Sequence, residues 1–276
     1  MGHYKNHPGS LFLRILVYLS ATVTIMVLFF IIAYILVKGI PNLKPELFAL
    51  KYTSENVSMM PAIINTFIIT ALTLVMAVPI GIFSAIYLVE YSKRGSKLVK
   101  IIRVTTETLS GIPSIVYGLF GFLMFNIAFK WGYTIFGGAL TLAIMILPLI
   151  IRTTEEALIA VPDSYREGSF GLGAGKLRTI FCIIVPSAVP GILSGVILGI
   201  GRITGETAAL LYPAGTAPVV PDSLFSSGRT LAVHMYALLS EGLYMEQAYA
   251  TAVVLLVVVV LINALSSFIA KRLEKR

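Results

Sequence analysis

The sequence predicts an all-α, polytopic membrane protein with six transmembrane helices. Three observations support this prediction. Hydrophobic residues make up 57% of the 276 residues and only 12% are charged, about half the charged fraction of a typical soluble domain. The chain contains six apolar segments of about 20 residues, the length needed to cross a bilayer. The Lys and Arg residues gather in short clusters between these segments, as membrane orientation signals do.

The apolar segments differ in regularity. The uncharged stretch 15–37 is longer than the apolar core of a secretory signal, which has about 7–15 residues, so we expect it to remain as a first helix. The fourth segment is the least regular, because its apolar run ends at Ile151, before three charged residues. The six predicted spans are 15–37, 63–88, 105–128, 135–157, 182–210 and 248–270.

The distribution of basic residues predicts the orientation. Of the 21 Lys and Arg residues, 15 lie near the two ends of the chain or in the connections 91–103 and 152–178. Five lie in 38–60, 129–134 and 211–247, and the remaining one lies inside a span. The positive-inside rule therefore places both termini in the cytoplasm, in agreement with an even number of spans. This pattern accounts for the net charge of +8 without a nucleic-acid partner.

Two charge pairs with helical spacing are expected near the cytoplasmic side. Arg152 and Glu156 lie four residues apart on a helical extension of the fourth span, so they can pair on one face. Arg103 and Glu107 have the same spacing near the inner end of the third span. We expect this second pair to be a structural ion pair at the membrane interface.

A short cytoplasmic helix is predicted to start near Tyr165. Pro162 ends the preceding helix, because proline lacks the N–H that a helix needs. Asp163 or Ser164 can then cap the new helix, since their side-chain oxygens accept hydrogen bonds from its first N–H groups. This segment is polar and glycine-rich, in contrast with the apolar span that follows it.

The longest external connection is 211–247, which contains three prolines. Loops of this length are often functional or bind a partner. Within it, the stretch 230–239 (TLAVHMYALL) is apolar enough for a short helix on the outer surface. The three histidines, His3, His7 and His234, show no metal-ligand spacing. We therefore expect no metal site, and expect His234 to be a surface or packing residue.

Arg202 is the most informative residue in the apolar part of the chain. A guanidinium inside a span costs at least about 2.5–3.5 kcal/mol, so it normally faces protein or water. Its planar fork suits oxyanions, because it donates two parallel hydrogen bonds. In one interpretation Arg202 contacts an anion in a substrate path, and Thr204, Glu206 and Thr207 shape the site. In the other, Glu206 lies one helical turn later and forms a buried ion pair with Arg202 that holds two helices together.

Small residues recur every four positions in the same span, at Gly191, Gly195 and Gly199. This spacing leaves a flat stripe that the backbone of another helix can approach closely. Gly201 and Gly205 extend the small surface toward the buried charges. The partner helix can belong to this chain or to another one, and the spacing does not decide between them.

No nucleotide-binding or catalytic site is predicted. The stretch 171–177 (GLGAGKL) fails as a P-loop, because Phe170 and Leu177 stand where Gly and Ser or Thr are needed. It fails as a dinucleotide-binding loop as well, because Lys176 occupies the last Gly position. No nucleophile, base and metal constellation is evident. We therefore expect no cofactor in this chain.

The same region resembles the EAA loop of permeases in ABC importers. The core pattern of that loop is Glu-Ala-Ala, three residues, Gly, nine residues, Ile, one residue and Leu-Pro. The matching positions are Glu167, Gly168, Ser169, Gly173, Ile183, Val185 and Pro186. Gly and Ser thus replace both alanines, and Val replaces Leu. The resemblance implies that a short helix fits a groove on a separate ATPase subunit. The residues it assigns to this contact are Arg166, Glu167, Gly168, Ser169, Gly173 and Lys176.

Three further stretches resemble phosphate-specific transport permeases: 109–121, 201–215 and 231–242. Gly-Glu-Thr-Ala-Ala followed by Leu-Leu and Ala-Gly is similar to the PstA rather than the PstC type. The resemblance covers about residues 60–270 and implies a type I (MetI-like) importer core. It also implies inorganic phosphate as solute, the prokaryotic plasma membrane as location, a PstC-like sister permease and a PstS-like extracytoplasmic binding protein. ATP and Mg²⁺ would bind to two PstB-like ATPase subunits.

These expectations divide the chain into three parts. Residues 1–59 hold the N-terminal tail, the first span and the first external loop. Residues 60–270 form the permease domain, with its coupling loop at about 164–186, and 271–276 form a basic tail. Two alternative functions stay open. One is a permease for another oxyanion, such as sulfate or molybdate, and the other is a stand-alone channel or secondary transporter without an ATPase.

Overall fold

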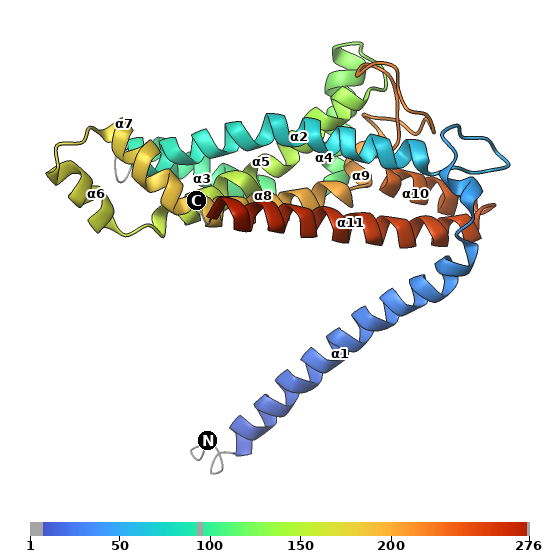
Figure 1. The fold of residues 1–276 in the computed structure, drawn as a ribbon, viewed down its shortest axis with the longest axis horizontal. Coiled ribbons are helices and arrows are strands. Elements are labelled where there is room, and N and C mark those ends of the chain that lie inside the picture. Colours follow the sequence, from blue (N-terminus) through green and yellow to red (C-terminus); the bar gives the residue numbers. More distant parts are fainter. Residues whose placement is uncertain (1–7, 93–95, 275–276) are drawn as a thin grey trace.

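The computed structural model describes residues 8–92 and 96–274, and this part of the chain is helical without a β-strand (Figure 1). Four long helices run side by side in a bundle: α2 (Met60–Ile86), α5 (Ile135–Ile159), α8 (Val185–Thr204) and α11 (Met245–Glu274). α1 (Pro8–Gly39) meets the bundle at its C-terminal end and projects away from it. In the described residues, five helices are long and apolar enough to span a membrane, or six if one bent pair counts as a span.

α5 forms the centre of the bundle and packs against α2 on one side and α8 on the other. It is the most fully buried of the candidate spans, because neighbouring helices cover most of its surface. Thr134 caps its first turn, since its Oγ1 accepts a hydrogen bond from the Gly137 N–H at 3.0 Å. The main apolar core includes Ile69, Leu142, Ile146, Ile150, Ile203 and Leu210.

π-Helical turns extend two of the long helices. α2 continues through Tyr87–Tyr91. α7 (Lys176–Thr179) continues through Ile180–Ile184 into α8, so that Lys176–Thr204 forms one apolar helix. The start of α7 and the end of α8 therefore belong to one continuous helix.

The third predicted span, 105–128, is wrong as a single helix. It consists of the C-terminal part of α3 (Lys97–Ser110), then α4 (Ser114–Gly121) and a π-helical turn at Phe122–Ala128. The helix direction bends by 101° between the two arms. The break falls at 111–113, Gly-Ile-Pro, because proline has no N–H to continue the helix and disfavours helical backbone at the preceding residue.

The fifth predicted span, 182–210, also needs correction, because α8 ends at Thr204 and α9 (Ala208–Leu211) is a separate short helix. The short helix predicted at 230–239 is confirmed as α10 (Leu231–Glu241). Thr230 caps α10 by accepting a hydrogen bond from the Val233 N–H. One face of α10 is buried against the bundle, so it is packed more tightly than a helix lying on the surface.

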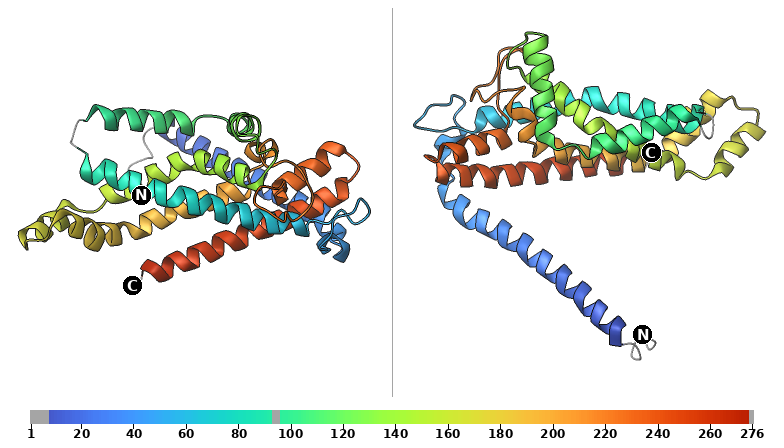
Figure 2. Two further views of the ribbon diagram at one scale, coloured as in Figure 1. Left: turned by 90° about the horizontal axis from the view of Figure 1, so that it is seen from above. Right: turned by 180° about the vertical axis from the view of Figure 1, so that it is seen from behind.

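The predicted inner and outer connections lie toward opposite ends of the bundle (Figure 2). α6 (Asp163–Gly171) and α7 lie at one end, and α11 runs toward that end at its C-terminus. The first loop, the 129–134 connection and the segment around α10 lie at the other end. This separation agrees with the sorting of the basic residues, and the assignment of the α6 end to the cytoplasm stays a prediction.

Candidate functional site

The predicted coupling segment forms α6 and the turn into α7. Pro162 has extended backbone (φ −57°, ψ 139°), and α6 begins directly after it at Asp163. No side-chain hydrogen bond caps this helix, so the predicted cap by Asp163 or Ser164 is wrong. Asp163 instead lies inside the first turn, where its negative charge is favourable near the positive end of the helix dipole.

The six predicted coupling residues do not share one face. Ser169 is buried, and its hydroxyl lies 2.8 Å from that of Thr179, which joins α6 to α7. Arg166 turns inward, with a side chain only 16% exposed. The exposed members are Glu167, Gly168, Gly173 and Lys176. These four are therefore available to a partner, whereas the other two hold the shape of the segment.

Four large apolar side chains that sequence reasoning missed are exposed at the same end of the bundle. They are Tyr165, Phe170, Leu172 and Leu177, and Leu172 is 91% exposed. Exposed apolar groups gathered among polar residues are typical of protein interaction sites. Their signal in the sequence was the occurrence of large apolar residues in a polar, glycine-rich stretch. We call these four residues, together with the exposed coupling residues, the coupling surface.

Arg202 lies in the last turn of α8 and its side chain is exposed. Arg202 lines a groove of about 560 Å³ between α5, α8 and α11. An exposed guanidinium on an apolar helix is costly in lipid, so this face must meet protein or water. The groove is lined by Leu149, Ser194, Ile197, Leu198, Gly201, Arg202 and Asn263.

Asn263 of α11 is the groove residue that sequence reasoning missed. Its amide lies close to Gly201, where an added Cβ would be 3.4 Å from the Asn263 Oδ1. A polar residue within the last apolar span was the signal that could have found it. The seven lining residues include no carboxylate, so the amide and the guanidinium leave the groove with hydrogen-bond donors and a positive charge.

The predicted pair of Arg202 with Glu206 does not form. The helix ends at Thr204, and beyond Gly205 the spacing of four residues no longer corresponds to one helical turn. Glu206 Oε1 accepts a hydrogen bond from the Ala209 N–H at 3.1 Å, at the start of α9. Among the described residues, Arg202 takes part in no ion pair.

The two predicted threonines do not line the groove. Thr204 is fully buried, and its hydroxyl donates to the Ile200 carbonyl within α8 at 2.8 Å. Thr207 directly precedes α9, beyond the end of α8. Of the four residues predicted to contact or shape an anion site, the structure therefore places only Arg202 in this groove.

The glycine stripe of α8 packs against α5 of the same chain, which resolves the alternative that spacing left open. A Cβ on Gly191 would lie 2.6 Å from the Ala157 Cβ, and one on Gly195 would overlap Thr153. Gly199 faces α5 as well. The absence of side chains on this stripe lets the two helix backbones approach closely.

One of the two predicted charge pairs forms. Arg152 Nε donates to Glu156 Oε1 at 3.0 Å, as the helical spacing predicts. Arg103 pairs with Glu155 of α5 rather than with Glu107 of its own helix. The prediction was wrong because it considered neighbours within one helix, whereas α3 packs against α5. This ion pair therefore ties the amphipathic α3 to the central helix.

Comparison with known proteins identifies the family. The family described as "Binding-protein-dependent transport system inner membrane component" matches residues 77–276. The chain belongs to this family. It is a multi-pass membrane permease of a binding-protein-dependent ABC importer, a pore component whose ATPase is a separate subunit.

Relatives and solved structures agree with this assignment. The permease is 32% identical over 276 residues to the probable ABC transporter permease protein YqgI of Bacillus subtilis, with 94% of each chain covered. It is 35% identical over 217 residues to phosphate transport system permease protein PstA 1 of Mycobacterium tuberculosis (76% of this chain, 71% of the relative). PstA of Pasteurella multocida is 41% identical over 182 residues (65% and 64%).

Two solved importers share the fold. A bacterial alginate ABC transporter in complex with its alginate pentasaccharide-bound periplasmic protein gives a TM-score of 0.72 at 16% identity, covering 99% of the permease and 98% of that chain. The inward-facing MetNI methionine ABC transporter gives 0.59 at 18% identity, covering 78% and 94%. These likenesses confirm the predicted importer-permease fold.

The permease also holds a buried cluster near the outer connections. His234 of α10 is fully buried, and its ring lies edge-on to Tyr52 at 6.2 Å. The Arg229 guanidinium lies 4.9 Å from the centre of the same Tyr52 ring. Burial, and then the charge of Arg229, lowers the pKa of His234 to about 3, so this histidine is neutral. His234 is thus a packing residue, and the described residues hold no cluster of potential metal ligands.

Proposed function

We propose that this permease is one membrane half of an ATP-driven importer of inorganic phosphate. The observation that carries the proposal is the exposed guanidinium of Arg202 in a groove with no carboxylate among its lining residues. Such a site suits an oxyanion, because the guanidinium fork matches phosphate oxygens. The choice of phosphate is supported by the relatives named phosphate transport system permease proteins.

In this proposal the other half of the pore is a PstC-like permease that covers the groove face of α8. Two PstB-like subunits bind ATP and Mg²⁺, and one of them receives the coupling surface. Because α7 and α8 are continuous, a displacement of this end by the ATPase moves the helix that carries Arg202. Arg202 then contacts the anion transiently, and Asn263 adds hydrogen-bonding capacity in the same groove.

The orientation follows from the positive-inside rule, with both termini in the cytoplasm of a prokaryote and the permease in its plasma membrane. The outer connections, including α10, then face the side from which a PstS-like protein delivers phosphate. Glu206 and the two neighbouring threonines have structural roles in this proposal, because they end α8 and begin α9.

The test is reconstitution of the full-length permease with its co-purifying subunits in vesicles. We expect the uptake of ³²P-phosphate to require ATP and the binding protein. Excess sulfate or molybdate should not reduce this uptake. Strong competition by either anion would favour a permease for that oxyanion. Phosphate flux through vesicles that contain the permease alone would favour a stand-alone channel or secondary transporter.

A further inference from the structure

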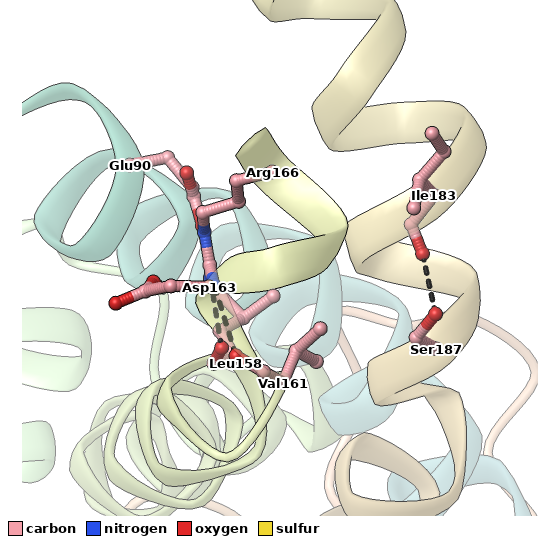
Figure 3. Close-up of polar contacts among 7 residues, drawn as sticks. All are labelled: Glu90, Leu158, Val161, Asp163, Arg166, Ile183 and Ser187. Carbon is pink, nitrogen blue, oxygen red and sulfur yellow. Dashed lines mark hydrogen bonds and ion pairs between the residues drawn. The ribbon is translucent and has the colours of Figure 1, made fainter. Parts of the chain in front are cut away.

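The Arg166 side chain extends from α6 toward Glu90, at the end of a second helix (Figure 3). Its Nε and Nη2 donate to Glu90 Oε1 at 3.1 and 2.7 Å. Glu90 lies in the π-helical turn Tyr87–Tyr91 that ends α2. The two side chains are only 16% and 9% exposed, so this ion pair is largely removed from water.

The same guanidinium binds the end of α5. Nη2 donates to the Leu158 carbonyl at 3.0 Å, and Nη1 donates to the Val161 carbonyl at 2.9 Å. α5 ends at Ile159, and the last carbonyls of a helix have no partner within it. The planar guanidinium has five donors in a fixed fork, so one side chain can serve both helix ends at once.

A further contact stays within α6. Nη1 also donates to Asp163 Oδ1 at 3.2 Å, and the Asp163 side chain is 72% exposed. Exposed pairs of this kind contribute little to stability. Glu90 and Asp163 are thus two carboxylates on the same guanidinium, one buried on another helix and one exposed on the same helix.

On the side toward α8, the start of α6 stands apart from the bundle. A groove of about 450 Å³ lies there, and its lining includes Tyr165 of α6 and Ser187 and Gly191 of α8. The Ser187 hydroxyl of α8 donates to the Ile183 carbonyl in the preceding π-helical turn at 2.7 Å, so it does not hold α6 (Figure 3). Among the described residues, Arg166 thus links the start of α6 to the ends of α2 and α5, whereas Ser169 links its later turn to α7.

We propose that Arg166 is a positioning residue that ties the coupling helix α6 to the ends of α2 and α5, with Glu90 as its counter-ion. The inference rests on the proposed function, in which an ATPase displaces α6. α2 and α5 form the main core together with α8. A displacement of α6 therefore reaches these two helices through Arg166, in addition to α8 through α7. Arg166 itself does not contact the ATPase.

The first test measures the physical link in the full-length permease alone. Amide hydrogen exchange is followed in α6 for the wild type, Glu90→Gln and the matched control Asp163→Asn. We expect exchange in α6 to rise at least about fivefold in Glu90→Gln, the lower end of typical coupling between sites, and to stay within about twofold in the control. Equal exchange in both variants would overturn the proposal. If Glu90→Gln shows no cooperative unfolding transition, and so has not folded, Arg166→Lys takes its place. This variant should also loosen α6, because a lysine cannot reach Glu90 and both carbonyls together.

The second test measures coupling in the assembled importer, as ³²P-phosphate transported per ATP hydrolysed. We expect Glu90→Gln to keep the ATPase bound and to lower this ratio at least about fivefold, with Asp163→Asn close to the wild type. Release of the ATPase without looser exchange in α6 would instead assign Arg166 to the docking contact. A wild-type complex that transports no phosphate would refute the proposed function, whereas the exchange experiment would still decide whether Arg166 ties α6 to the bundle.

Discussion

Arg202 and His234 show how the same fold treats two basic side chains in opposite ways. Arg202 stays exposed at the end of α8, in a groove whose lining residues supply no counter-charge. His234 is enclosed beside Arg229 and Tyr52, and burial keeps it neutral. The first arrangement leaves a charge available to a ligand, and the second removes a titratable group from the physiological range.

Replacing Arg202 by alanine should reduce phosphate uptake by the assembled importer by about 10–100-fold. This range corresponds to the loss of a hydrogen bond to a charged group, which contributes about 1.5–3 kcal/mol. Arg202→Lys should fall between, because lysine keeps the charge but loses the two parallel donors. The control is Thr204→Val, because the Thr204 hydroxyl donates to the Ile200 carbonyl within α8. Normal uptake by Arg202→Ala would contradict the anion role, and loss of assembly would assign Arg202 to subunit contact.

The stability of the permease should fall as the pH is lowered from about 6.5 toward 3, because of His234. The unfolded chain binds a proton on this histidine near pH 6.5, whereas the folded protein does so only near its pKa of about 3. As the pH falls, the unfolded state therefore binds this proton first. Between the two pKa values, the free energy of unfolding decreases by about 1.4 kcal/mol for each pH unit. Thermal unfolding at pH 7.0, 6.0 and 5.0 measures this, above the range where most carboxylates titrate.

The control for this pH dependence is His234→Phe. Phenylalanine retains an aromatic ring against Tyr52 and has no group that titrates. Both ring nitrogens of His234 are buried without a hydrogen-bond partner among the described residues, so the exchange sacrifices no observed bond. If the variant loses as much stability as the wild type between pH 7 and 5, another group is responsible.

What the sequence could reveal at the site depends on whether a helix continues. The cost of a charge in an apolar span pointed to Arg202, and the same reasoning applied to Asn263 would have added the second groove residue. The pairing with Glu206 assumed a helix through Gly205, and the helix ends there. Arg103 was assigned to Glu107 on spacing alone, although its partner Glu155 comes from another helix.

At the scale of elements, the coupling segment depends on one glycine in a left-handed turn. Gly173 follows α6 with φ +84°, and its N–H donates to the Phe170 carbonyl at 2.9 Å. The next N–H, of Ala174, donates to the Ser169 carbonyl at 3.1 Å. This turn reverses the chain between α6 and α7 and sets the position of the coupling surface.

Gly173→Ala should strain this turn by about 1–2 kcal/mol, the cost of left-handed backbone for a residue with a Cβ. No atom of the described residues lies within 4 Å of the added Cβ, so the effect is conformational rather than steric. Hydrogen exchange of the Ala174 amide should quicken by about 5–30-fold. The matched control is Gly175→Ala, which also has no neighbour within 4 Å in the described part of the chain but lies at φ −75°. Equal exchange in the two variants would show that the left-handed backbone is not what holds the turn.

Element boundaries were predictable where apolar length alone decides them. The predicted spans 15–37, 63–88, 135–157 and 248–270 each lie within a helix, with α2 extended by its π-helical turn. The prediction of one helix over 105–128 was wrong because the chain breaks at Gly-Ile-Pro. Such a break is tolerated where neighbouring groups form hydrogen bonds with the backbone groups that it leaves without a helical partner. Here the Tyr117 hydroxyl of α4 donates to the Leu109 carbonyl of α3 at 2.9 Å. Such support from another element is a tertiary contact, which local sequence patterns do not encode.

At the scale of the whole molecule, the single chain exposes three surfaces that need lipid, another protein or water to cover them. α1 carries almost entirely exposed apolar side chains and joins the bundle near Gly39, which packs against the Tyr249 backbone of α11. The coupling surface exposes aromatic and aliphatic groups at one end. The groove of Arg202 exposes a charge on an apolar helix. Lipid suits the first surface, whereas the other two require protein or water, which fits a subunit of a larger importer.

The opposite placement of the coupling surface and the outer connections gives a prediction for the whole chain in its membrane. The only cysteine, Cys182, is exposed, so Cys182→Ser provides a background without thiols. Single cysteines are then introduced at Gly9, Ser164 and Ser223, all of which are exposed. In right-side-out vesicles, a membrane-impermeant maleimide should label only Ser223→Cys, because the positive-inside rule places the other two positions in the cytoplasm. In inside-out vesicles the pattern should reverse. Labelling of Ser164→Cys from outside would remove the coupling surface from any contact with a cytoplasmic ATPase.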